Sequence, residues 1–120
     1  MFNFEKLAVW QRALELADLV YALTRSFPDT ERFGLTTQMR RAAVSVPSNI
    51  AEGSSRGSRT DFARFIEIAT GSLFELVTQA TLAHRQGLLS QPDYQRLYAT
   101  AEELSKMLSG LRRTLHADSA

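Results

Sequence analysis

The stretch RRAAVSVPSNIAEGSSRGS, residues 40–58, places two arginines before a run of small and apolar residues that contains Pro47. Its apolar residues recur at steps of three and four, which is the spacing of one face of an α-helix. A proline inside a helix removes one backbone donor and crowds the carbonyl group four residues earlier. We therefore predict a helix over 35–53 that is kinked at Pro47 and ended by Gly53.

The rest of the chain has the same helical period. Apolar residues at helical spacing predict further helices over 6–27, 59–87 and 91–116, and the last of these carries a regular seam of leucines. Short connections favour antiparallel neighbours. The sequence therefore predicts an all-α fold, an up-down-up-down antiparallel four-helix bundle that forms a single domain over residues 1–120.

The first predicted helix is apolar over more than one face. One stripe contains Trp10, Leu14 and Tyr21, and a second stripe that contains Leu16 and Val20 runs beside it. A helix in a four-helix monomer needs about one apolar stripe. The excess indicates either a contact with a neighbouring subunit or an unusually wide contact with the protein's own core.

Composition restricts the class of protein. The 120 residues are 44% hydrophobic, enough for one core, and no apolar run approaches the roughly 18 residues of a membrane span. The first residues do not have the pattern of a secretory signal peptide, so we expect a cytoplasmic protein without a membrane segment. Cysteine is absent, which excludes disulfides and thiolate metal sites.

Positive charge is concentrated in one part of the chain. The whole sequence has a net charge of +1, but residues 32–64 contain six arginines and two acids. A cluster of arginines and polar donors suffices for diffuse contacts with a phosphate backbone. The candidate nucleic-acid contacts are Arg40, Arg41, Arg56, Arg59 and Arg64. The alternative is that the loop after residue 53 is only a helix connection, because its spacing matches no nucleotide-binding motif.

Three other residues, two in the quoted stretch and one in the third predicted helix, have structural interpretations. Asn49 and Glu52 lie on the polar side of the predicted helix 35–53. Glu75 approaches the core side of the third predicted helix, and an antiparallel hairpin brings it near Arg40 or Arg41. We expect a partly buried ion pair there that orients the two helices.

No catalytic or metal-binding pattern is evident. His84 and His116 lack a second ligand three or four residues away, and neither a Glu-x-x-His nor a Gly-x-Ser-x-Gly motif occurs. Both histidines suit the carboxyl end of a helix, where a positive charge is favourable. The sequence therefore predicts a protein that is not an enzyme and has no metal site and no cofactor.

Four stretches together carry a resemblance to a known family. They are LAVWQRALELADLVYALTRSFP, ERFGLTTQMRRAAVSVPSNIAEGSSRGS, DFARFIEIATGSLFELVTQ and LAHRQGLLS, in this order. With them the chain closely resembles the 23S rRNA intervening sequence protein family, a family of bacterial four-helix-bundle proteins, over roughly residues 2–115. The most specific part of the resemblance is the run from Arg40 to Gly53.

The resemblance implies a homo-oligomer, a pentameric ring of up-down bundles. The family is similar to the accessory protein of diversity-generating retroelements, which binds nucleic acid and a reverse transcriptase. Many members are encoded within insertions in ribosomal RNA genes, and the resemblance implies no enzymatic activity. Two hypotheses follow: a ring-forming accessory protein that binds RNA or DNA, or an adaptor that binds a protein partner and no nucleic acid.

Overall fold

Four long helices make up the protein. The structure is a computed structural model that describes residues 1–117, and its long helices are α1 (Ala8–Thr24), α2 (Leu35–Ser54), α3 (Arg59–Arg85) and α4 (Gln91–Ala117). Two short 3-10 helices, η1 (Asn3–Lys6) and η2 (Asp29–Glu31), precede α1 and α2. Each long helix begins and ends within three residues of the range that the periodicity predicts.

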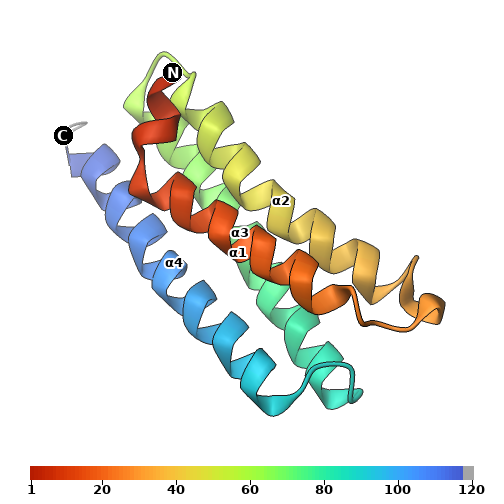
Figure 1. Cartoon of the computed structure of the whole chain (residues 1–120). Helices are drawn as coiled ribbons and strands as arrows, with labels where there is room; N and C mark the ends of the chain where they lie inside the picture. Colours follow the sequence, from red (N-terminus) through yellow and green to blue (C-terminus); the bar gives the residue numbers. More distant parts are fainter. Residues whose placement is uncertain (118–120) are drawn as a thin grey trace.

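The helices form an antiparallel bundle about 48 Å long and 23 by 21 Å across (Figure 1). α1 packs against α2 and α4, and α3 packs against the same two helices, so the four helices surround one core. α4 ends at the end of the bundle where α1 begins (Figure 1). The predicted all-α, four-helix fold is confirmed. Among the described residues, no helix has both the length and the apolar character needed to cross a membrane.

The core is apolar and is supplied by all four helices. The leucine seam of α4 is buried as its spacing predicts, with Leu97, Leu104 and Leu108 at 0% exposure. α2 and α3 make the most extensive pairing in the bundle. Small side chains such as Ala43 and Ala69 let these two helices approach closely. Burial of the apolar face of each helix, rather than helix propensity alone, stabilises that helix.

Gly53 has a different role from the one that we predicted. It lies inside α2, is buried and does not have the positive φ of a glycine cap. A Cβ atom at this position would lie 2.6 Å from Cβ of Phe65 on α3 and 3.0 Å from the ring of Phe62. Gly53 therefore lets the backbone of α2 approach Phe65 and Phe62 of α3 more closely than a residue with a Cβ atom would.

Two serine hydroxyls end α2 in place of a glycine. Ser54 Oγ donates to the carbonyl oxygen of Ala51 at 2.7 Å, and Ser55 Oγ donates to that of Glu52 at 2.6 Å. Because carbonyl groups of the last turn gain these partners, the helix needs no residue in the left-handed region. The next helix begins as predicted, since Ser58 Oγ accepts a hydrogen bond from the backbone N–H of Asp61.

α2 continues through Pro47, whose ring is buried. The kink at this residue stays a prediction. Next to it lies a polar contact between α2 and α3, in which Asn49 Nδ2 donates to the carbonyl oxygen of Ser45 at 2.8 Å and to Ser45 Oγ at 3.0 Å. The Ser45 hydroxyl in turn lies 2.8 Å from Ser72 Oγ on α3. Asn49 thus bonds only within α2, to the serine whose hydroxyl contacts α3.

The extra apolar stripe of α1 is divided between the core and the surface. Leu7 and Trp10 pack against the core, and Ala17 is buried. Leu14 and Tyr21 remain 38% and 37% exposed. Part of the stripe therefore widens the contact of α1 with the protein's own core, which was one of the two alternatives. The rest of the stripe is exposed, as the other alternative, a subunit contact, requires.

α1 is tied to α4 by an arginine. Arg12 Nη2 donates to Glu103 Oε2 at 2.9 Å, and Arg12 Nη1 pairs with Glu15 on α1. Hydrogen bonds to Glu15 and then Glu103 raise the pKa of Arg12 above its ordinary value. The pair links the two helices across the surface of the bundle.

Candidate functional site

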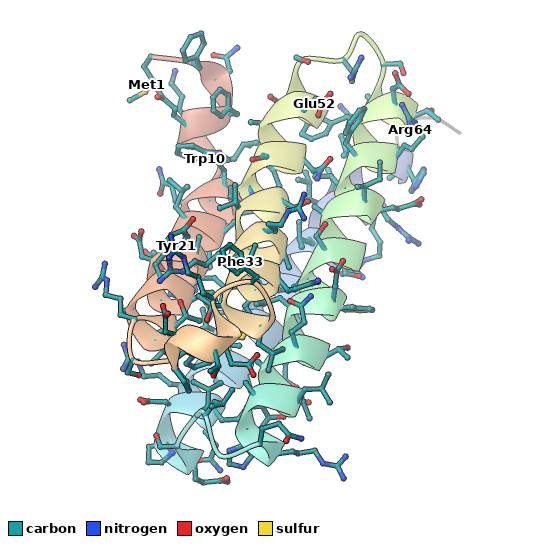
Figure 2. The ribbon with its side chains drawn as sticks, turned by 90° about the vertical axis from the view of Figure 1, so that its right-hand side faces the viewer. Met1, Trp10, Tyr21, Phe33, Glu52 and Arg64 are labelled. Atoms are coloured by element: carbon teal, nitrogen blue, oxygen red, sulfur yellow. The ribbon has the colours of Figure 1, made fainter. Side chains whose placement is uncertain are left out.

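The five candidate arginines lie in two separate places. Arg56, Arg59 and Arg64 are at the connection between α2 and α3, whereas Arg40 and Arg41 lie in the first half of α2. Figure 2 shows Arg64 and Glu52 at this connection, well separated along the bundle from Tyr21. The two groups therefore do not form one continuous basic site.

Two arginines of the connection, Arg56 and Arg64, are paired with carboxylates within the chain. Arg56 Nη2 donates to Glu52 Oε1 at 3.0 Å, and Arg64 Nε donates to Asp61 Oδ1 at 3.2 Å. Both guanidinium groups also lie over the ring of Phe65, at 4.5 and 4.8 Å from its centroid. Each of these arginines has a carboxylate and an aromatic partner, so the connection presents less positive charge than its sequence indicates.

Arg59 has a structural contact as well. Its Nη2 donates to the carbonyl oxygen of Thr114 at 3.1 Å, near the end of α4. This bond joins the beginning of α3 to the last turns of α4. The connection after α2 thus fits the alternative interpretation, a helix connection whose arginines hold the end of the bundle together.

Arg40 points to α1 and is held there by two side chains. Its Nε donates to Thr24 Oγ1 at 3.0 Å, and its guanidinium carbon lies 4.6 Å from the centroid of the Tyr21 ring. Thr24 is buried, and its hydroxyl donates to the carbonyl oxygen of Val20 at 2.8 Å. The guanidinium group therefore has a fixed position at the α1–α2 surface.

A pocket of about 530 Å³ lies beside Arg40. Its lining residues, from α1 and α2, are Tyr21, Thr37, Arg40, Arg41, Val44 and Ser45. We call it the Arg40 pocket. Among the residues that the structure describes, no carboxylate lies within 4.0 Å of the guanidinium nitrogens of Arg40 or Arg41. Arg40 and Arg41 are thus two adjacent arginines whose charge no carboxylate among the described residues compensates.

The expected ion pair of Glu75 with Arg40 or Arg41 is wrong. Glu75 is exposed, and its Oε1 accepts a hydrogen bond from Gln79 Nε2 at 3.2 Å. Arg40 is turned away from α3 because Thr24 and Tyr21 hold it against α1. The α2–α3 pair is oriented instead by apolar packing and by the Ser45–Ser72 contact.

Sequence reasoning missed Tyr21 and Thr24 as partners of Arg40. Thr24 follows Val20 at the spacing of the buried face, where a hydroxyl needs a hydrogen-bond partner. That spacing is the only sequence signal for this role. Tyr21 was assigned to an apolar stripe, and nothing in the sequence shows that an arginine from α2 covers its ring.

A second hollow, of about 430 Å³, lies between α3 and α4. Phe74 and Tyr98 line it and are 58% and 44% exposed, and Glu102 is its only acidic lining residue among those described. We call it the Phe74 groove. Sequence analysis missed it as well, although Phe74 stands just outside the core stripe of α3.

The histidines make local contacts. His84 Nδ1 lies 3.0 Å from the carbonyl oxygen of Leu89, and its ring stacks on Tyr94 with the centroids 4.6 Å apart. His116 Nε2 lies 3.9 Å from Glu67 Oε1. Within residues 1–117, no three His, Cys, Asp or Glu side chains are grouped so that they could hold a metal ion.

Comparisons with known proteins agree with this fold. The model of the family described as 23S rRNA-intervening sequence protein matches residues 5–110. A protein of unknown function from the S23 ribosomal protein family of Bacteroides thetaiotaomicron has a similar crystal structure, with a TM-score of 0.79 and 23% sequence identity. The match covers 88% of this chain and 99% of that one. No curated protein matches the chain significantly, and the relation to the retroelement accessory protein stays a prediction.

Proposed function

Because the chain belongs to the 23S rRNA-intervening sequence protein family, we propose that it is a cytoplasmic, ring-forming accessory protein, without enzymatic activity, that binds RNA or DNA. One observation carries the proposal: Arg40 is half-buried, Arg41 is next to it, and neither has a carboxylate partner among the described residues. Arginines that are not paired within the chain can neutralise phosphates.

A ring would strengthen weak contacts of this kind. Five copies of a site around one axis can engage one strand together, so the overall affinity exceeds that of a single site. A net charge of only +1 for the chain does not oppose this, because binding depends on the charge near the site. Repulsion between a nucleic acid and distant acidic side chains is screened beyond about 10 Å at 0.1 M salt.

Binding of a labelled single-stranded RNA, followed by fluorescence anisotropy over a salt series, tests the proposal. We expect the logarithm of the association constant to fall linearly with the logarithm of salt concentration, by about 0.7 per phosphate contacted. Combining Arg40→Gln with Arg41→Gln should reduce the slope by about 0.7 per arginine removed. Combining Arg56→Gln with Arg64→Gln is the control, and its effect should be smaller because both arginines are already paired. An intact assembly that binds no RNA or DNA at low salt would contradict the proposal.

The proposed pentamer is supported by apolar side chains that the bundle leaves exposed. They are Leu14 on α1 and, on the α3–α4 side, Phe74 and Tyr98. Light scattering should give a mass five times the 13.4 kDa of one chain. Phe74→Ser should lower this mass, whereas Leu82→Ser, a change of another exposed residue of α3, should not. A monomer at micromolar concentration would rule out the ring.

The second candidate function is a protein adaptor that binds no nucleic acid. The Phe74 groove favours it, because exposed aromatic side chains are enriched where proteins bind one another. The two candidates differ in a pull-down from a lysate. An adaptor recovers a protein whose binding is lost in Phe74→Ser, while recovery of RNA without a protein counts against it.

A further inference from the structure

We propose that the Arg40 pocket is a binding site for one phosphate group, with Arg40 as its oriented donor and Arg41 as a second charge. The inference rests on the proposed function and specifies its site, because it moves the phosphate contact from the α2–α3 connection to the surface between α1 and α2. The phosphate is either the phosphodiester of a nucleic acid strand or a free phosphate ion. The two share the anionic oxygens that a guanidinium group recognises.

The first argument is that Arg40 is already oriented. The Thr24 hydroxyl gives its hydrogen to the carbonyl oxygen of Val20, so a lone pair of Thr24 Oγ1 remains for the N–H of Arg40 Nε. Thr24 is only 2% exposed, so water does not compete for this bond. An arginine held at its Nε loses less side-chain freedom when a ligand binds.

The second argument is the direction in which Arg40 can bind. The guanidinium carbon of Arg40 lies over the Tyr21 ring at 4.6 Å, and its Nε is bonded to Thr24, which leaves the two Nη groups for a ligand. Within residues 1–117, these two Nη groups donate no hydrogen bond. Two parallel N–H donors in one plane match the spacing of two phosphate oxygens.

The third argument is the absence of a compensating acid. Arg56 and Arg64 also lie over an aromatic ring, that of Phe65, but each bonds to a carboxylate. Arg40 has the same aromatic contact and no carboxylate among the described residues. A half-buried cation gains from a bound anion, since part of its hydration is already lost.

The pocket has room and further donors. Its volume of about 530 Å³ is open to solvent, and it is lined by Arg41 and by the exposed Tyr21. Thr37 also lines the pocket, but its hydroxyl donates to the carbonyl oxygen of Arg32 and so supplies no donor to a ligand. Arg40 and Arg41 therefore form the recognition set.

The experiment observes Arg40 directly, by following arginine Nε–H signals in ¹⁵N-labelled protein by NMR. The signal of Arg40 is identified by its loss in Arg40→Lys. Inorganic phosphate and a single-stranded decanucleotide are titrated separately at constant ionic strength. We expect both to shift the Arg40 signal saturably, and to leave the signals of Arg56 and Arg64 in place.

Two variants test the positioning of Arg40 without removing its charge. Thr24→Val keeps the shape of the side chain and removes the acceptor, and we expect phosphate affinity to fall about tenfold. Thr70→Val is its matched control, because Thr70 on α3 makes the same intrahelical bond, to Ile66, and contacts no arginine. Tyr21→Leu, at an exposed position, gives a second variant in case Thr24→Val folds poorly.

Each outcome decides a separate point. Unchanged phosphate affinity in both Thr24→Val and Tyr21→Leu, or an Arg40 signal that phosphate does not move, overturns the pocket. RNA binding that shifts Arg56 and Arg64 but not Arg40 overturns the pocket and leaves the proposed function standing. Phosphate binding in the pocket without any nucleic-acid binding supports the site and removes the proposed function. A lower assembly mass in Arg40→Lys makes the pocket a subunit contact and overturns the inference.

Discussion

Gly53→Ala is expected to lower the free energy of unfolding by about 2 kcal/mol. The added Cβ would meet Cβ of Phe65 at 2.6 Å, a distance at which one helix must move away from the other. The contacting atom belongs to the rigid base of a side chain, so no rotation relieves the clash. Urea unfolding followed by circular dichroism measures the change, and the gain in helix propensity from alanine, about 1 kcal/mol, is already included.

Gly71→Ala is the matched control for this prediction. Gly71 lies in the middle of α3, and a Cβ atom there would have no other atom within 4 Å. We therefore expect this change to raise the free energy of unfolding by about 0.5 to 1 kcal/mol. Equal effects of the two substitutions would show that propensity, and not the close approach of α2 to α3, decides the result at Gly53.

Leu76→Ala is expected to have a still larger effect, a loss of about 3 to 4 kcal/mol. Leu76 is 0% exposed in the core, so truncation removes buried apolar surface and leaves a cavity among the helices. Leu82→Ala makes the same chemical change on the same helix at a side chain that is 47% exposed. This control should cost less than about 1 kcal/mol.

The comparison of these two variants, by urea unfolding at several protein concentrations, also reports on assembly. If Leu82 were buried against another subunit, Leu82→Ala would cost more as the protein concentration rises. A loss of less than about 1 kcal/mol in Leu76→Ala would contradict the packing of α3 in the core.

The periodicity of the sequence predicted the helices and the core well. An apolar residue, usually leucine, at every third or fourth position of α4 indicates which face is buried, and burial of that face is what the bundle needs. The roles of single residues were less accessible. Whether a glycine caps a helix or admits a neighbour depends on the facing residue, and at Gly53 that residue is Phe65, on the next helix.

The candidate site was predicted only in part. The basic segment could be read from the sequence, but a count of charges does not show which arginines are paired. Arg56 is paired with Glu52, whereas Arg40 has no acidic partner among the described residues. That distinction depends on which way each side chain leaves its helix. Arg40 turns to α1 because the Thr24 hydroxyl and the Tyr21 ring lie there. Both residues come from a different part of the chain.

The hydrogen bond between Ser45 and Ser72 selects one alignment of α2 and α3. Sliding one helix along the other by a single turn, about 5.4 Å, would place each hydroxyl against different neighbours and separate this pair. The same slide would move Gly53 away from Phe65, and a residue of α2 with a Cβ atom would then face Phe65 at this close approach. The Ser45–Ser72 pair and Gly53 therefore both favour the same alignment of α2 and α3 over alignments shifted by a turn.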